Sequence, residues 1–214
     1  LEHLKDLYRE ALDYPGVIGL TIGTRPDCID IEKLEYLREL SENYYITIEY
    51  GIESCYDKTL KRINRGHSFE EAVEAVEKTA AYGINTGAHF IFGLPGETTE
   101  DMLAEASIIS SLPLKTVKFH QLQILRGTAM EVEYNNNAGD FHVFTLEEYL
   151  NFFIRFLELL NPSIVVERFT GEVPPRYKVN QGFGDKRTEQ ILTLVERRLE
   201  ELDTWQGRLY DQST

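Results

Sequence analysis

Apolar residues recur at intervals of three and four in several segments of the chain, the spacing expected of helices with one buried face. Leu4, Leu7 and Tyr8 show this spacing near the N-terminus. Three later segments begin with a capping-box pattern, in which a Ser or Thr is followed three residues later by an acidic residue. The predicted helices are 1–13, one beginning at the Asp30 cap, about 68–82, one from Thr98 to about 112, one from Thr145, and about 186–202.

Short apolar runs rich in β-branched residues separate these helices and predict strands at 17–22, 45–48, 86–92, 116–125 and 164–166. Strands that alternate with helices favour an α/β fold with a parallel sheet and right-handed crossovers. We predict a partial parallel β/α (TIM-like) barrel containing its later strands and helices, with an open doubly wound sheet as the alternative. Residues 1–166 are assigned to the barrel, and residues 167–214 to a C-terminal extension whose helix packs on it.

Composition is compatible with a packed core, because 42% of the 214 residues are hydrophobic. No apolar run reaches the 18 or so residues that a membrane span requires. The N-terminus lacks the basic and apolar stretches of a signal peptide. It also lacks an initiator Met and begins inside an amphipathic pattern. We therefore expect a fragment of a longer protein, with no membrane partner.

The two cysteines, Cys28 and Cys55, lie far apart and outside any CxxC spacing. This usage is typical of a protein of the reducing cytoplasm. The formal net charge of −14 argues against binding to a nucleic-acid backbone, since that requires Lys and Arg to displace counterions. We attribute the acidic excess to solvated helix faces.

Polar, small and ionisable residues gather directly after the predicted strands, where both candidate folds place function. They occupy segments 23–27, 49–54, 64–67, 89–97 and 120–128. Each has a structural alternative: Gly93 and Gly96 suit a tight turn, Glu97 can complement a helix dipole, and His89 or His120 can be a core histidine. Their joint placement favours a site.

No Walker loop, nucleophile elbow or GxGxxG motif occurs, and the histidines lack metal-ligand spacing. We therefore assign no catalytic and no metal-binding residue to the chain.

Three segments, taken in order, resemble the radical S-adenosylmethionine (SAM) superfamily, namely Ile48–Ser54, Arg62–Ser68 and Phe90–Thr98. The likeness is to the branch that contains the oxygen-independent coproporphyrinogen oxidases, the methylthiotransferases and the Elongator catalytic subunit. Within that branch the chain is similar to the bacterial iron–sulfur oxidoreductase group related to YhcC. In that group, segments like His120–Leu122 and Asp203–Gly207 also recur, so the resemblance covers nearly the whole chain.

This resemblance implies SAM and a 4Fe-4S cluster as cofactors, with the cluster held by three cysteines of a CxxxCxxC loop. Reduction of bound SAM, by a donor such as flavodoxin or ferredoxin, then yields a 5′-deoxyadenosyl radical that abstracts a substrate hydrogen. Neither the CxxxCxxC loop nor the Gly-Gly-Glu segment that holds the SAM amino group occurs here. Cys28 and Cys55 cannot replace the loop at their spacing. We expect both motifs upstream of Leu1, so the fragment alone should be inactive.

The resemblance also implies roles for individual polar residues. Glu53 corresponds to a polar residue after the fourth barrel strand that contacts the SAM ribose. Arg65 matches an Arg that meets the SAM carboxylate in the coproporphyrinogen oxidases, a task that suits a guanidinium fork. His89 stands where those oxidases carry an acidic ribose ligand. Arg25 lies where some relatives carry an acidic residue, and no role is assigned to it.

Two further segments complete the expected adenosyl pocket. Gly93, Leu94 and Pro95 match the turn beside the adenine, where backbone atoms can read the ring. The family's sixth-strand segment lines the adenine pocket and corresponds here to Phe119, Gln121 and Leu122.

We therefore predict the C-terminal part of a radical SAM iron–sulfur enzyme that reductively cleaves SAM for radical chemistry on an unknown substrate. Two alternatives stay open. One is a tRNA-modifying or nucleic-acid-binding relative, against which the net charge counts. The other is a non-catalytic barrel scaffold that has lost its cysteines.

Overall fold

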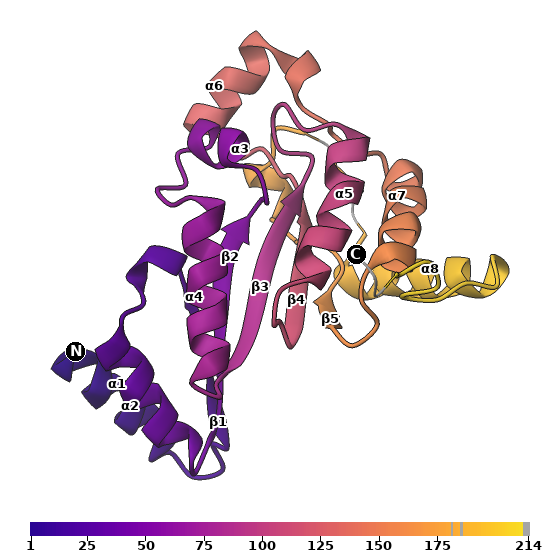
Figure 1. Ribbon diagram of the computed structural model, residues 1–214. Helices are drawn as coiled ribbons and strands as arrows, with labels where there is room; N and C mark the ends of the chain where they lie inside the picture. Colours follow the sequence, from indigo (N-terminus) through magenta and orange to yellow (C-terminus); the bar gives the residue numbers. More distant parts are fainter. Residues whose placement is uncertain (181, 185, 212–214) are drawn as a thin grey trace.

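Five parallel strands lie side by side in one sheet, in the order in which they occur along the chain (Figure 1). The computed structural model describes residues 1–180, 182–184 and 186–211. The strands are β1 (Gly19–Thr24), β2 (Tyr45–Glu53), β3 (Asn85–Phe92), β4 (Thr116–Gln121) and β5 (Val165–Arg168). A consecutive order is that of a β/α barrel, whereas a doubly wound sheet reverses its order at a switch point. The predicted partial barrel is confirmed, and the doubly wound alternative is wrong.

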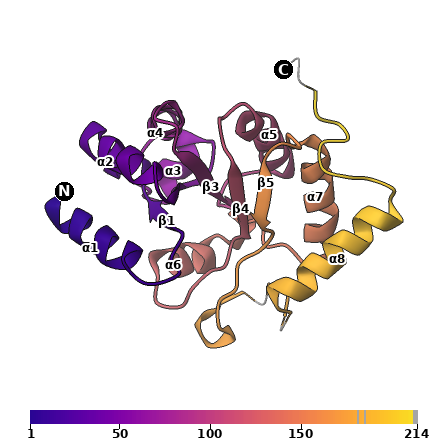
Figure 2. The same cartoon turned by 90° about the horizontal axis from the view of Figure 1, so that it is seen from below.

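Helices connect successive strands, and Figure 2 shows α2, α4 and α5 together on one side of the sheet. The helices are α1 (Glu2–Leu12), α2 (Ile31–Ser41), α3 (Asp57–Arg62), α4 (Phe69–Ala81), α5 (Thr99–Ser110), α6 (Ala129–Asn136), α7 (Leu146–Leu159) and α8 (Thr188–Glu201), with 3₁₀ turns η1 (Pro26–Cys28), η2 (Ala138–Asp140) and η3 (Pro175–Tyr177). The sequence did not predict α3 or α6. The first has six residues and the second buries none of its own, so neither leaves an apolar stripe in the sequence.

The predicted helix starts are confirmed by their capping bonds. Ser68, Thr98 and Thr145 each form a complete capping box with the acidic residue three positions later. The Asp30 carboxylate accepts a hydrogen bond of 2.9 Å from the Lys33 backbone N–H. These side chains satisfy N–H groups that the helix itself leaves unpaired, which is why the starts are readable from sequence.

An aromatic core fills the space between the sheet and its helices. Phe92 and Phe119, on neighbouring strands, stack at 5.1 Å between ring centroids, and both lie about 5 Å from Phe156 of α7. All three side chains are fully buried. The core extends to α8, whose Ile191 and Val195 belong to the same buried cluster. Helix α8 therefore packs on the same core as the sheet.

The fourth strand is shorter than the predicted segment 116–125, because β4 ends at Gln121. Beyond it, Leu122 and Ile124 turn into a second buried cluster with Leu94 and Phe141. The Ile124 carbonyl accepts a hydrogen bond of 2.8 Å from the Val179 N–H, so this stretch pairs with the C-terminal segment instead of extending the sheet. Among the described residues, no helix is long and apolar enough to cross a membrane.

Candidate functional site

Loops that follow β1, β2, β3 and β4 meet at one edge of the sheet, because the strands are parallel and in register. Side chains alternate along each strand, so one face is the aromatic core and the other is polar. In a β/α barrel, the face opposite the helices is the barrel interior. The candidate site comprises this polar face and the C-terminal edge above it.

Glu53 ends β2 directly after an irregularity in the β2–β3 register. Its φ of 76° lies in the left-handed region that non-glycine residues avoid. One carboxylate oxygen lies 3.1 Å from Nη2 of Arg65, and both side chains are largely buried. Burial raises the pKa of the Glu53 carboxyl, and the Arg65 charge opposes this shift. A strained backbone and a shielded ion pair at a strand end are typical of functional positions.

Gly51 is essential to this arrangement, and sequence reasoning assigned it no role. Its carbonyl accepts hydrogen bonds from Nε and Nη2 of Arg65 at 3.1 and 2.6 Å. A Cβ at this position would lie 2.3 Å from Nη2, so a larger residue would displace the guanidinium. The clue in the sequence is a glycine inside a strand that contains several β-branched residues, since such a glycine often marks a close backbone approach.

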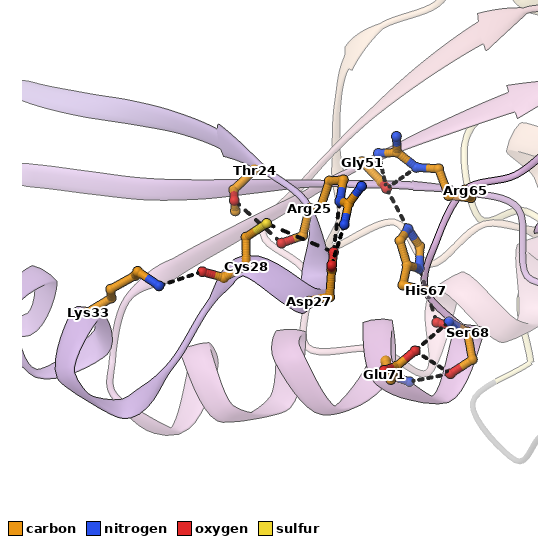
Figure 3. A network of polar contacts seen from close by, with 10 residues as sticks. All are labelled: Thr24, Arg25, Asp27, Cys28, Lys33, Gly51, Arg65, His67, Ser68 and Glu71. Atoms are coloured by element: carbon orange, nitrogen blue, oxygen red, sulfur yellow. Dashed lines mark hydrogen bonds and ion pairs between the residues drawn. The ribbon is translucent and has the colours of Figure 1, made fainter. Parts of the chain in front are cut away.

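Figure 3 shows further polar residues around the same carbonyl. The His67 ring lies with Nε2 at 3.3 Å from the Gly51 oxygen and Nδ1 at 3.1 Å from the Ser68 oxygen. Arg25, after β1, pairs with Asp27 and lies beside Gly66, where a Cβ would be 3.6 Å from its guanidinium. The structure therefore brings Arg25 next to the Arg65 turn, a proximity that the sequence did not predict.

The turn after β3 is built by two glycines with φ of 89° and 85°, Gly93 and Gly96. A Cβ on Gly93 would lie 2.3 Å from the His142 carbonyl oxygen. The Gly93 N–H donates to the sulfur of Met102 at 3.0 Å, and Leu94 is buried in the second cluster. Pro95 is buried as well. The turn is thus tightly packed, which explains its glycines without a ligand.

The predicted ribose position, His89, lies on the polar face in a network of ion pairs. Its Nε2 is 3.0 Å from one oxygen of Glu49, and Lys118 binds the other oxygen while also lying 3.2 Å from Glu167. Burial disfavours the Glu49 charge, yet hydrogen bonds from Lys118 and His89 lower the pKa of this carboxyl overall. Glu49 follows the predicted strand 45–48, and the structure makes it a buried residue within β2.

His120 completes the polar face, with its ring centroid 5.8 Å from that of His89. Burial, together with the nearby charges of His89, Arg168 and Lys118, lowers its pKa to about 4. The ring is therefore neutral at pH 7. The sequence could have indicated this group of polar side chains, since strand alternation places positions 49, 89, 118 and 120 on one face of the sheet.

The predicted β4 residues mostly support the structure around the site. Phe119 points into the aromatic core. The Gln121 oxygen accepts hydrogen bonds from Thr170 and from the Gly171 N–H, while its amide nitrogen donates to the Gly171 carbonyl. Leu122 lies in the second cluster. These three residues fix the β4 edge and the loop that crosses it.

Two carboxyl groups near the turn are buried, and sequence reasoning named only Glu97 of the two. Glu97 accepts a hydrogen bond of 2.6 Å from Ser54, and Glu105 accepts one of 2.7 Å from the Cys55 N–H. Burial, and then the neighbouring Glu97 charge, raise the pKa of Glu105 to about 8. Glu97 is buried and directly precedes Thr98, the N-cap of α5. Glu105 was detectable as an acid within the apolar stripe of α5.

Metal ligands are not assembled in the described part of the chain, where no group of three His, Cys, Asp or Glu side chains could hold an ion. Cys28 is exposed, whereas Cys55 is buried. Burial and the charge of Glu105 raise the pKa of the Cys55 thiol, which disfavours the thiolate that iron requires. The residues present do not fit a 4Fe-4S cluster.

Comparison with solved structures identifies the fold. The chain superposes on the archaeal Elp3 of Methanocaldococcus infernus with a TM-score of 0.73, over 88% of this chain and 43% of that one, at 23% identity. Coproporphyrinogen III oxidase (HemN) of Escherichia coli gives a TM-score of 0.53 over 66% of this chain and 32% of that one, at 18% identity.

Sequence comparison extends the likeness along the whole chain. An uncharacterised protein of Methanocaldococcus jannaschii is 36% identical over 96% of this chain, and YtqA of Bacillus subtilis is 30% identical over 99%. The chain spans 64% and 65% of the lengths of these two relatives. The family model for the radical SAM superfamily matches residues 1–107, and that for the radical SAM C-terminal domain matches residues 114–201. The chain therefore belongs to the radical SAM superfamily.

Proposed function

We propose that this chain supplies the later half of the barrel to an enzyme that reductively cleaves SAM and uses the resulting radical on a substrate. When bound, SAM and its 4Fe-4S cluster provide a 5′-deoxyadenosyl radical able to abstract a hydrogen atom. The chain's own residues would bind and orient the adenosyl and amino-acid groups. Since no cluster ligands are assembled among the described residues, we propose that cysteines outside residues 1–214 hold the cluster.

The observation that carries the proposal is the Glu53–Arg65 pair at the C-terminal edge. Three contacts fix the guanidinium through Nε and Nη2, two to Gly51 and one to Glu53. Among the described residues, its Nη1 has no hydrogen-bond acceptor, which leaves two N–H groups for an incoming carboxylate. A preorganised guanidinium binds a carboxylate at lower entropic cost than a mobile one.

We propose the remaining SAM contacts from the same family resemblance. Glu53 would accept hydrogen bonds from the ribose hydroxyls, and its raised pKa keeps open a donating role. His89 is already paired with Glu49 through Nε2, so a ribose hydroxyl would have to bind His89 alongside that contact. Gly93, Leu94 and Pro95 would border the adenine through backbone atoms. Phe119, Gln121 and Leu122 would support that wall from β4.

Anaerobic turnover tests the proposal. Full-length protein would be reconstituted with iron and sulfide, then incubated with dithionite and SAM. We expect 5′-deoxyadenosine and methionine in equal amounts by mass spectrometry, and neither without dithionite. A preparation with four irons per chain that forms no 5′-deoxyadenosine would contradict the proposal.

A tRNA-modifying role is the second candidate, favoured by a relative named tRNA uridine(34) acetyltransferase of Methanocaldococcus infernus. That protein is 23% identical over 73% of this chain, which itself covers 29% of the relative. The net charge of −14 counts against an RNA substrate, because RNA binding draws its affinity from cationic surfaces. We therefore keep radical chemistry on a small molecule as the leading proposal.

A further inference from the structure

A cavity of about 350 Å³ lies where β4 ends, beneath the loop that leads to α8. Its lining runs from Gln121 and Gly171 to the beginning of α8 at Arg187 and Ile191. The volume is within the range of small-molecule sites. Because Gln121 pairs with Phe92 across the sheet, the cavity opens one strand away from the Gly93 turn.

Three cationic side chains line this cavity, namely Lys178, Lys186 and Arg187. No described carboxylate forms an ion pair with any of the three. Glu172 is the acidic residue of the described lining, and its carboxylate already accepts a hydrogen bond from the Thr188 N–H. The sequence from 170 to 188 carries four basic and two acidic residues, whereas the whole chain carries 22 and 36. A cationic cavity is therefore a local exception in an acidic protein.

Specific contacts hold the cavity wall in place. Gln121 and Gln123 both donate to the Gly171 carbonyl, at 3.2 and 2.5 Å. At the far side, Leu125 and Lys178 form an antiparallel bridge, and the Asn180 amide oxygen accepts from the Ile124 N–H at 2.9 Å. These bonds tie both ends of the loop to the extension of β4. The Lys178 backbone is thus held at the cavity wall.

The N-terminus of α8 adds a further favourable term for an anion. This helix has 14 residues, and its first turn borders the cavity at Arg187 and Ile191. The helix dipole makes such an end positive, while the Thr188 N–H donates to Glu172 and the Arg187 N–H to Gln190. Three cations and a helix N-terminus around one half-open cavity match an oxyanion ligand.

We propose that this cavity binds the carboxylate or phosphate group of a small anionic substrate and so orients it toward the adenosyl pocket. The inference rests on the proposed function, which it deepens by naming the substrate class. The cavity lies at the same strand edge as Glu53 and Arg65, so an anchored substrate would extend across the C-terminal mouth. Its small volume suits a small molecule better than a duplex or stem of RNA, which needs an extended cationic surface.

Titration calorimetry with the purified protein tests the anion site directly. Inorganic phosphate and malonate serve as probes at constant ionic strength, with wild type compared to the Lys178→Gln/Lys186→Gln double variant. We expect wild type to bind at least one probe and the double variant to bind it about tenfold more weakly, as expected for lost charge-assisted contacts. Phosphate binding alone indicates a phosphate ester, and malonate binding alone a carboxylate.

Lys115→Gln is the matched control, since Lys115 is an exposed cation at the opposite end of β4. It should leave probe binding unchanged. Equal affinity in wild type and the double variant, or no binding of either probe, overturns the inference. So does displacement of bound phosphate by tRNA at stoichiometric concentration, which would assign the cavity to RNA. SAM cleavage by wild type is scored in a separate assay, so failure of the proposed function is distinguishable from failure of the anion site.

Discussion

Arg65 illustrates how much the identity of one residue leaves undecided. Its place in the segment Arg62–Ser68 predicted a carboxylate-binding role, yet its contacts depend on Gly51, fourteen residues earlier. The guanidinium can reach that carbonyl only because position 51 has no Cβ. At the residue scale, the sequence supplies the functional group, while a neighbour from another element supplies its orientation.

Replacing Arg65 tests its proposed part in SAM binding. We expect Arg65→Gln to weaken SAM binding to the reconstituted protein by about 10- to 100-fold, because charge-assisted hydrogen bonds contribute roughly 1.5–3 kcal/mol. Arg65→Lys should recover only part of this loss, since an ammonium lacks the planar fork. Equilibrium dialysis with labelled SAM gives the dissociation constants. Arg38→Gln, an exposed cation on α2, is the control, and an unchanged constant for Arg65→Gln would remove the residue from the site.

Glu105 gives a prediction for the pH dependence of stability. Burial raises its pKa in the folded chain from the usual 4.5 to about 8, so the folded chain holds a proton that the unfolded chain releases between these values. The stabilisation of the folded chain by protonated Glu105 is therefore complete below pH 4.5 and is lost as the pH rises through 8. Glu105→Gln keeps an acceptor for the Cys55 N–H and removes the titration.

We expect the free energy of unfolding of Glu105→Gln, relative to that of wild type, to increase from pH 5 to pH 8 by on the order of 3 kcal/mol. Urea unfolding at the two pH values measures the difference. The exposed Glu100 of the same helix provides the control Glu100→Gln, which should show no such gain. An advantage of Glu105→Gln that is equal at pH 5 and pH 8 would show that this carboxyl does not titrate in the range.

At the scale of elements, the capping residues and apolar stripes were sufficient to place most helices and strands. Ser68, Thr98 and Thr145 act within one turn of the chain, so their effect is local and readable. The end of β4 could not be predicted from the sequence, because Leu122 and Ile124 continue the apolar pattern of the strand. They leave the sheet for a cluster formed with Phe141, a contact between distant segments.

The turn between β3 and α5 should be the element least tolerant of a methyl group. Gly93→Ala places a Cβ 2.3 Å from the His142 oxygen at a φ of 89°. We expect the free energy of unfolding to fall by about 3 kcal/mol or more, since backbone strain and a clash with the carbonyl oxygen act together. Thermal unfolding measures this loss. Gly139→Ala, with open space around its Cβ and no positive φ, should change stability by less than about 1 kcal/mol. Similar melting temperatures for both variants would contradict the account.

At the scale of the whole molecule, charge separates the two proposed substrate classes. A chain with 36 acidic and 22 basic residues repels a polyanion, while a cationic cavity can still accept a small anion. We expect no retention of tRNA on filters by the protein at about 150 mM salt. Retention that falls steeply with added salt would instead indicate phosphate contacts and favour the tRNA-modifying candidate.

Hydrophobic periodicity, capping residues and strand-end motifs determined the parallel β/α architecture and the family by sequence alone. These features are local, so each can be read within a few residues of the chain. The tertiary structure alone decided which residues meet: Gly51 with Arg65, Glu49 with His89 and Lys118, and Glu97 with Glu105 beneath the turn. It also formed the cationic cavity, in which residues from 171–178 and from the start of α8 lie beside Gln121 at the end of β4. Such contacts join segments tens of residues apart, and their formation depends on packing and burial that no local pattern encodes.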